Sequence, residues 1–599
     1  MTTSQSQLAQ IHAQMQGGDV PGALRAIAAV VSAEPRNGAA WQLAGMIRRR
    51  SKDFVGAVAG FNHALTCGVR TAELHNSLAL TYEDLEQFPE AESAYQAALA
   101  CDPGYLQAQI NAARLKHKRG HSTEAVAALR SILERHPTSV LASNALAGVL
   151  ADEGDAGLAA DQYRASLARS PDNLAATIRL GVTLREDGQA DAALAHLQAA
   201  AARFGQSPEF VDAMCGALIE CGKVAEAETL LERLVQQTPS YFPAHRALAR
   251  LAYEYRTGKD PYRSYRAMLN QWPAERTIWQ NWFGLMLDHR DHAEVVTEAE
   301  HARKVLGALP EIDFYEAVAR GELGQGEEAE QLYARAHRQF GETAGFIAAR
   351  ARNALRRGEP LQTQALARQA AERDRSDQFA WAYLGLAWRL LDDPREFWLH
   401  DYTAHVEQRP VPYLSEPGAL DELRDTLRSL HRASHHPPDQ SLRGGTQTEG
   451  ELFKRSDPVI RRLRDAIREQ VDGYITRFAA DPAHPHYWGP DAAFRFSGSW
   501  SVRLTGQGFH VAHIHRAGSI SSALHITVPP ANPDDVAEAG ALVLGAPPSE
   551  LGLDLAPRRV VPPIEGALVL FPSSMWHGTH PFTAMGERLT VAFDVSVIR

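Results

Sequence analysis

The sequence predicts a multidomain protein in which an all-α array of paired helices precedes a β-rich domain. Three observations predict this fold class. The chain has 599 residues, which is too long for a single hydrophobic core. Alanine recurs every 34 residues from Ala23 to Ala227 and stands again at the same phase at Ala329. From about residue 492, short β-rich runs separated by Gly or Pro replace that rhythm.

Each 34-residue unit predicts two antiparallel helices. The alanine lets the two helices approach closely, and a proline after the second helix prevents its continuation. Gly or Asp in DEGD, REDGQ and ECGK forms the turn between the helices. One unit cannot bury its apolar face alone, so neighbouring units stack into a superhelix. The recurring residues are Ala23, Ala57, Ala91, Ala125, Ala159, Ala193, Ala227 and Ala329, with Pro35, Pro103, Pro137, Pro171 and Pro239 in a second phase.

Residues 5 to 390 resemble the tetratricopeptide repeat family. Trp41 and Gly45 match its W-x2-L-G opening, with Ala44 where leucine is usual. The pattern weakens between about 245 and 320, and we expect about eleven units in all. The resemblance implies a groove that binds a protein or peptide; a purely structural or oligomerising role is the alternative. In the unit after the one that contains Trp41, the remaining signature positions of the family are occupied by Leu78, Tyr82, Ala91, Tyr95, Ala98 and Pro103. In the weaker units, Pro261, Val295 and Thr363 stand where the periodic alanine belongs.

Composition excludes several classes of function. A net charge of -11 and a pI near 6.1 argue against a general nucleic-acid binder. The four cysteines contain no CxxC pair, so small buried residues are favoured over a disulfide framework or a zinc site. The chain begins without an apolar signal segment, and no run approaches membrane-spanning length. We therefore expect a cytoplasmic protein that binds neither membrane nor nucleic acid.

The 34-residue repeat pattern of the sequence ends at about residue 390. The stretch SLRGGTQTEG and a group of prolines predict a linker over residues 391–450, between a repeat array at 1–390 and a second domain at 451–599. The prolines are Pro410, Pro412, Pro417, Pro437 and Pro438. A helix beginning at Pro458 follows, and its apolar face predicts that it packs against a sheet. The strands after it predict a sandwich or barrel. The apolar face consists of Val459, Leu463, Ile467, Val471 and Tyr474.

Three histidines form a candidate metal site. In HVAHIHRAG, His513 and His515 project from the same side of an extended segment and can chelate one ion. A third ligand must come from elsewhere, and GALVLFPSSMWHGTHP places His577 just beyond a strand. Imidazole suits iron, zinc, nickel and copper alike, so these residues leave the metal open. His484 and His486 form a second His-x-His in a proline-rich loop, and we rank that pair below the first.

The last predicted strand, ERLTVAFDVSVI, adds an anion-binding pair. Arg588 and Thr590 lie on its polar face, opposite an apolar set that begins at Leu589. A buried Arg needs an anion, and its guanidinium fits a carboxylate through two hydrogen bonds, to which a Thr hydroxyl can add a third. A solvated Arg on an edge strand is the alternative.

These segments resemble the bacterial 2-oxoglutarate-Fe(II) oxygenases of the double-stranded β-helix (jelly-roll) class, in a subgroup often fused to tetratricopeptide repeats. In that class a His-x-Asp/Glu pair and a distal His bind iron, and an Arg-x-Ser/Thr pair binds 2-oxoglutarate. The resemblance therefore implies iron ligands at His513, His515 and His577. It also implies co-substrate binding by Arg588 and Thr590. His515 stands where most of the superfamily has a carboxylate, although His-x-His is usual in the subgroup.

His525 stands in ALHITV, where the family commonly has an aromatic residue. It is a candidate contact for the co-substrate, and simple packing is the alternative.

The resemblance implies an enzyme that uses Fe(II), 2-oxoglutarate and O2 to hydroxylate a substrate carbon, releasing succinate. With the repeat array, the leading hypothesis is a dioxygenase acting on a protein or peptide. A cupin-like metalloprotein is one alternative, because Gly566, Pro572 and His577 echo cupin spacing, although a cupin gives Arg588 and Thr590 no role. A repeat scaffold whose terminal domain only binds is another.

Overall fold

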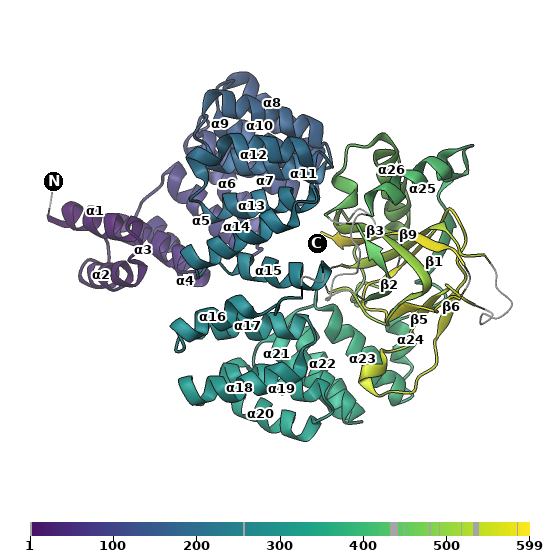
Figure 1. Cartoon of the computed structure of the whole chain (residues 1–599). Helices are drawn as coiled ribbons and strands as arrows, with labels where there is room; N and C mark the ends of the chain where they lie inside the picture. The colour runs from purple at the N-terminus through teal and green to yellow at the C-terminus, as the bar shows by residue number, and fades with distance from the viewer. Residues whose placement is uncertain are drawn as a thin grey trace. The chain divides into compact units, whose positions relative to one another are not determined.

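The fold was described from a computed structural model (Figure 1). The described residues are 3–255, 258–431, 441–448, 450–478, 481–489, 492–516, 518–530, 538–583 and 585–598. The chain forms two compact units, Met1–Glu153 with Leu158–Pro171, and Gly154–Gly157 with Asp172–Arg599. The division between the units therefore falls inside the helical array and not at residue 390. Within the described residues, no helix is both long and apolar enough to cross a membrane.

Paired helices make up the whole array. The first are α1 (Thr3–Gln16), α2 (Val20–Ala33), α3 (Gly38–Arg50), α4 (Phe54–Thr66), α5 (Ala72–Asp84), α6 (Phe88–Cys101), α7 (Leu106–Lys118), α8 (Ser122–Arg135), α9 (Val140–Asp152) and α10 (Ala156–Arg169). Next come α11 (Leu174–Glu186), α12 (Ala190–Phe204), α13 (Pro208–Glu220), α14 (Val224–Gln237), α15 (Phe242–Glu254), α16 (Arg263–Gln271) and α17 (Arg276–Asp288). The last are α18 (His292–Leu306), α19 (Pro310–Glu322), α20 (Gly326–Phe340), α21 (Ala344–Arg356), α22 (Pro360–Arg373), α23 (Gln378–Leu390) and α24 (Arg395–Leu399).

The turn between the two helices of a unit recurs with the predicted period. A residue with positive φ ends the first helix of each described unit, and these residues are 34 apart. Most are glycine, which adopts this conformation without steric cost. The rhythm continues to Asp392, so α23 and the short α24 form a truncated unit after the eleven pairs α1–α22. The positions are Gly18, Lys52, Glu86, Gly120, Gly154, Gly188, Gly222, Arg290, Gly324, Gly358 and Asp392, while position 256 lies outside the described residues.

The periodic alanines are the contact points of the helix pairs, because all eight are fully buried. Val295 and Thr363 occupy the same place and are also fully buried, so β-branched residues can fill it. Pro261 cannot continue a helix in this position, and there α16 is shortened to nine residues. The irregular repeats predicted between 245 and 320 therefore still form helix pairs.

The strands form two antiparallel sheets. One has the order β1-β7-β4-β9-β3-β2 and the other the order β6-β5-β8. The longest strand pair joins β3 and β9, and in its register Thr590 lies opposite Val502 and Arg588 lies opposite Leu504. The strands are β1 (Glu407–Pro410), β2 (Leu442–Gln447), β3 (Phe494–His510), β4 (Ile520–Thr527), β5 (Leu542–Leu544), β6 (Arg559–Val561), β7 (Ala567–Pro572), β8 (His577–Thr579) and β9 (Glu587–Val597).

The interval 391–450 differs from the predicted linker. It supplies both edge strands of the larger sheet, because β1 pairs with β7 and β2 pairs with β3. It also supplies α25 (Ala419–Leu430), whose Leu423 and Leu427 are fully buried. Two of its described prolines lie at the ends of short elements, since Pro410 is the last residue of β1 and Pro412 begins a 3-10 helix (Pro412–Ser415). A sequence pattern cannot distinguish such short elements from a linker. Residues 432–440 and 449 of this interval lie outside the described residues.

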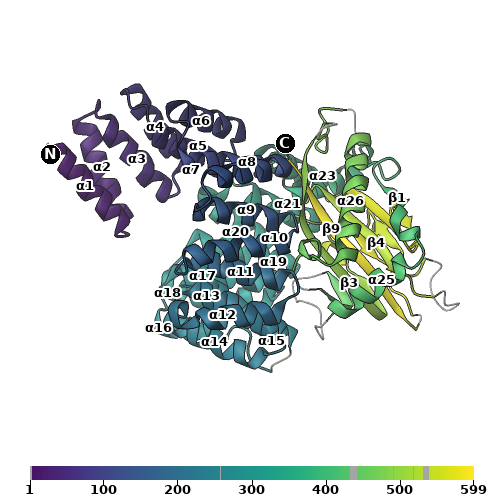
Figure 2. The same cartoon turned by 90° about the horizontal axis from the view of Figure 1, so that it is seen from above.

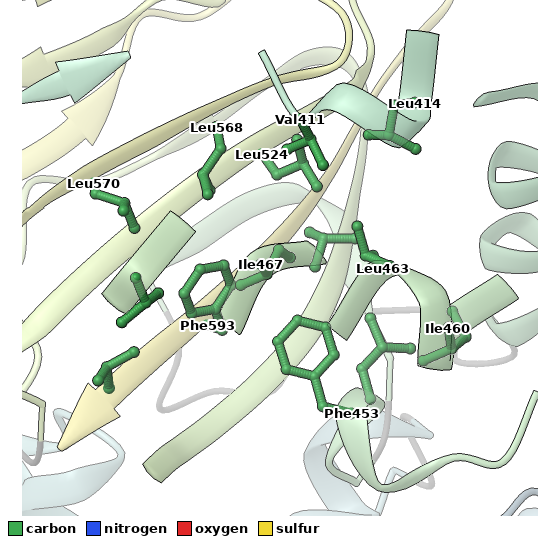
Figure 3. Close-up of a cluster of buried hydrophobic side chains, with 14 of the residues drawn as sticks. Val411, Leu414, Phe453, Ile460, Leu463, Ile467, Leu524, Leu568, Leu570 and Phe593 are labelled. Atoms are coloured by element: carbon green, nitrogen blue, oxygen red, sulfur yellow. The ribbon is translucent and has the colours of Figure 1, made fainter. Parts of the chain in front are cut away.

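Helix α26 (Pro458–Arg477) covers one face of the larger sheet, as predicted. Figure 2 shows α26 and α25 lying over this sheet. In Figure 3, Ile460, Leu463 and Ile467 of the helix face strand residues such as Phe593 and Leu524. All five residues of the predicted apolar face are buried. On β9 the apolar set Leu589, Val591, Phe593 and Val595 joins this core, which turns the alternate residues towards the opposite face of the sheet.

Candidate active site

The three predicted histidines come together. Two backbone hydrogen bonds join His513 to His577, with N–O distances of 2.9 and 3.0 Å, so the segment after β3 lies directly beside β8. His515 follows two residues later on the same side. One nitrogen from each ring lies within 4.8 Å of the others. The Nε2 atoms of His513 and His515 are 3.0 Å apart.

The Nδ1 atoms of the three rings are already engaged. His513 Nδ1 lies 2.8 Å from the Val511 carbonyl, and His577 Nδ1 lies 2.9 Å from the Met575 carbonyl. A carbonyl oxygen can accept a hydrogen bond but cannot donate one, so both rings carry their hydrogen on Nδ1 and direct the Nε2 lone pair inward. Lone pairs that converge in this way repel one another unless they share a cation. The donor set therefore fits a metal ion.

His515 is held by a carboxylate. Its Nδ1 lies 2.5 Å from Oδ1 of Asp594, a buried residue on the polar face of β9. The Ser521 hydroxyl donates to the same oxygen at 2.8 Å. A carboxylate on the outer nitrogen of an imidazole fixes the ring and strengthens its inner nitrogen as a metal ligand. The negative charge of Asp594 thus lies behind the His515 ring, whereas a carboxylate ligand at position 515 would place its charge directly on the metal.

Burial keeps the rings of His513 and His577 neutral. It lowers the pKa of His513 and of His577 well below the usual histidine value, and the neighbouring rings lower both further. A neutral ring is the form that binds a metal.

Arg588 lies in the same pocket as the histidines. Its side chain is almost fully buried, and its Nε has no hydrogen-bond partner among the described residues. Nη2 contacts the His525 Nε2 at 3.3 Å. Burial lowers the pKa of Arg588 to about 10, so the group is still charged at neutral pH. A buried cation of this kind is costly unless an anion compensates it.

Thr590 and His525 complete this end of the pocket. Thr590 is buried and directs its side chain to the same face of β9 as Arg588. His525 on β4 pairs in register with Thr590. Burial lowers the pKa of His525 to about 3, with Arg588 as a second cause, so its ring is a neutral acceptor for the guanidinium.

The remaining pocket wall includes residues that the sequence did not assign. Ser441 and Gln447, in the SLRGGTQT stretch, line the pocket because β2 is paired with β3. The Ser441 hydroxyl lies 3.0 Å from His510 Nδ1 and 3.2 Å from His513 Nε2. Trp500 also lines the pocket, with its ring centre 5.7 Å from that of His515. The other lining residues include Val502, Ser522, Ala523, Leu542, Phe571, Gly578, Thr579 and Ala592.

The second His-x-His pair belongs to a different part of the structure. His484 directs Nε2 to the Trp398 carbonyl at 2.9 Å, and its Nδ1 accepts the amide hydrogen of His486. His486 Nε2 lies 3.0 Å from the Ser574 hydroxyl. Their ring nitrogens are thus used in core hydrogen bonds, which agrees with the lower rank given to this pair. Arg503 pairs with Glu587 and does not line the pocket.

Comparison with known families agrees with both parts of the fold. Residues 498–594 match the family model described as "Putative 2OG-Fe(II) oxygenase". Two models described as "Tetratricopeptide repeat" match residues 184–251 and residues 8–68, 110–173 and 144–208. No curated protein matches the chain.

Three of the solved structures that are similar to part of the chain are the following. A tetratricopeptide repeat protein from Parabacteroides merdae is 16% identical, with 40% of this chain and 95% of that chain covered and a TM-score of 0.34. PilW, a widely conserved type IV pilus biogenesis factor, is 24% identical, with 35% and 97% covered and a TM-score of 0.31. TTC0263, from Thermus thermophilus, is 19% identical, with 29% and 94% covered and a TM-score of 0.26. The family models thus identify tetratricopeptide repeats in the helical array and a domain described as "Putative 2OG-Fe(II) oxygenase" in the carboxy-terminal β-rich part of the chain.

Proposed function

We propose that the protein is an Fe(II)- and 2-oxoglutarate-dependent dioxygenase that hydroxylates a protein or peptide recruited by the repeat array. The observation that carries this proposal is the buried, charged Arg588 in one pocket with three converging histidines. His513, His515 and His577 would hold the iron. Arg588 and Thr590 would bind the distal carboxylate of 2-oxoglutarate, and His525 would orient the guanidinium.

Charge supports a dianionic co-substrate. A divalent ion and Arg588 bring three positive charges to the pocket, and Asp594 brings one negative charge. The remaining two positive charges match the two carboxylates of 2-oxoglutarate. A cupin-like metalloprotein would leave Arg588 without an anion, so we prefer the oxygenase.

When bound, the iron supplies the oxygen chemistry, and the chain supplies binding and orientation. The Nδ1 hydrogen bonds hold the three rings in the tautomer that faces the metal. The apolar wall, including Phe571 and Leu542, keeps bulk water from the reacting groups.

The recruiting role of the repeat array follows from its fusion to this site. Repeats of this kind generally mediate protein–protein interactions, which favours a protein or peptide over a small molecule as substrate.

The test is binding and turnover of 2-oxoglutarate by iron-loaded protein. We expect Arg588→Ala to weaken 2-oxoglutarate binding by at least about 30-fold, because it removes one partner of a buried charge pair. Succinate release in the presence of cell proteins should fall with it. Arg503→Ala is the matched control, since Arg503 lies opposite Leu589 on the paired strand β3 but bonds to Glu587 outside the pocket. Iron-loaded wild-type protein that binds no 2-oxoglutarate would refute the proposal.

A further inference from the structure

The residues between the candidate ligands face away from the pocket. Ile514 separates His513 from His515, and Trp576 precedes His577. In extended segments successive side chains point to opposite sides. Because the three histidines face the pocket, Ile514 and Trp576 point away from it. Ile514 is 7% exposed and Trp576 is 4% exposed. Other residues of the chain must therefore cover Ile514 and Trp576 on the side of the candidate metal centre that faces away from the pocket.

The last repeat helices provide that cover. Ile514 and Trp576 belong to one buried cluster with side chains of the array. The ring centres of Tyr383 on α23 and Trp576 are 6.2 Å apart. The guanidinium of Arg516, directly after His515, lies 5.8 Å from the centre of the Phe379 ring on the same helix. The array residues in the cluster include Tyr383, Leu384, Leu386 and Trp388 of α23 and Leu399 of α24.

Polar contacts reinforce the same arrangement. Arg389, near the end of α23, donates to the Gly545 carbonyl at 2.8 Å and to the Ala556 carbonyl at 2.6 Å. The amide of Gly545 in turn donates to the Trp576 carbonyl at 2.8 Å. Arg389 is therefore two hydrogen bonds from the residue that precedes His577.

The contact continues into the interior of the array. The hydroxyl of Tyr383 is hydrogen-bonded to Arg352 on α21. Arg352 pairs with Glu322 on α19, with Nη2 2.8 Å from the carboxylate. Three successive repeat units are thus joined, through buried side chains, to the residues beside the candidate ligands.

We propose that α23 is a positioning element of the metal centre, so that the last repeats hold His513, His515 and His577 in place and do not serve only to recruit substrate. This inference rests on the proposed function only in assuming that the three histidines bind a metal ion. Coupling of this kind is reciprocal, and metal binding therefore stabilises α21–α23.

The test compares two buried tyrosines in the full-length chain. Tyr383→Leu removes the ring that contacts Trp576, and Tyr265→Leu removes an equally buried tyrosine from the core around α16 and α17. Both variants lose packing, so a similar fall in melting temperature is expected. Titration with Co²⁺, followed by visible absorption, should show at least about 10-fold weaker binding and an altered spectrum for Tyr383→Leu. The affinity and spectrum of Tyr265→Leu should remain those of the wild type.

A milder pair of variants covers the case in which Tyr383→Leu does not fold. Arg389→Gln removes the bonds to the two carbonyls. Arg263→Gln is the control, because it removes a similar charge from α16, where Arg263 pairs with Glu228 and Glu232 on α14. Weaker Co²⁺ binding by Arg389→Gln alone supports the proposal. In the wild type, Co²⁺ should slow hydrogen exchange in α21–α23 and leave α16–α18 unchanged.

Equal Co²⁺ affinity and spectra in Tyr383→Leu, Arg389→Gln and their controls would overturn this inference and leave the proposed function standing. Coupled Co²⁺ binding in a protein that never binds 2-oxoglutarate would support the inference and refute the proposed function.

Discussion

The carboxylate of Asp594 accepts hydrogen bonds from His515 and from Ser521, and it lines up with Arg588 and Thr590 on one face of β9. If His515 binds the metal as proposed, this arrangement would account chemically for a histidine at a position where the resemblance leads us to expect a carboxylate. The negative charge of Asp594 would be kept and would act on the metal through the imidazole ring. Asp594 would then influence the proposed metal centre without touching it.

We expect Asp594→Asn to weaken metal binding by about 10- to 100-fold, because it keeps the shape of the side chain and removes its charge. Co²⁺ titration measures the effect, and circular dichroism checks the fold. Asp481→Asn is the control, because Asp481 also accepts side-chain and backbone hydrogen bonds but lies outside the pocket. Equal affinity in the two variants would show that Asp594 only fills space.

Individual residues of the site differ in how far the sequence could predict their placement. The alternation of β9 predicted that Arg588 and Thr590 share a face, because the period of a strand is local. The pairing of Asp594 with His515 joins residues 79 positions apart, and no local pattern encodes it. The roles of Arg588, Thr590 and His525 in co-substrate binding stay predictions.

Elements with strong periodicity were predicted well, and short ones were not. The helix pairs and α26 repeat their apolar residues over many turns, and the structure confirms both. Strands β1 and β2 are four and six residues long, and their partners lie far along the chain. Their register depends on the sheet that they join, so the sequence alone suggested a linker.

The segment after α23 also makes the stability of the protein dependent on pH. Burial is the main cause of low pKa values for His400, about 3, and His405, about 4. His400 Nε2 bonds to the Ser574 hydroxyl at 2.8 Å. In the unfolded chain both rings take up protons near pH 6.5. Stability is therefore fully present above about pH 6.5 and is lost as the pH falls towards these lower values.

Replacing His400 should reduce this sensitivity to acid. The free energy of unfolding of the wild type should be lower at about pH 5 than at about pH 7.5. We expect this difference to be about 2 kcal/mol smaller in His400→Gln, because one buried ring no longer titrates. Urea unfolding at the two pH values, followed by tryptophan fluorescence, measures the change. His12→Gln, at an exposed position on α1, is the control. An unchanged loss in His400→Gln would mean that His400 does not govern the acid response.

For the whole molecule, the compact units do not follow the limits that composition predicts. Residues 172–599 form part of one unit, which contains α11–α24 together with both sheets. The interval 451–599 lacks β1, β2 and α25, and it lacks the helices that cover Ile514 and Trp576. A fragment cut at residue 451 would expose unpaired strand edges and an apolar surface.

We therefore expect fragment 172–599 to unfold cooperatively and to bind Co²⁺ nearly as tightly as the full chain. Fragment 451–599 should aggregate, because its core loses Val411, Leu414, Leu423 and Leu427 and its sheet loses both edges. Fragment 391–599 separates the effect of the missing strands from the effect of the missing helix, because it contains β1 and β2 and still lacks α23. It should be more soluble than 451–599 and should bind Co²⁺ at least about 10-fold more weakly than 172–599. Size-exclusion chromatography, circular dichroism and Co²⁺ titration measure these differences. Equal Co²⁺ affinity in 391–599 and 172–599 would show that the sheets alone hold the three histidines in place.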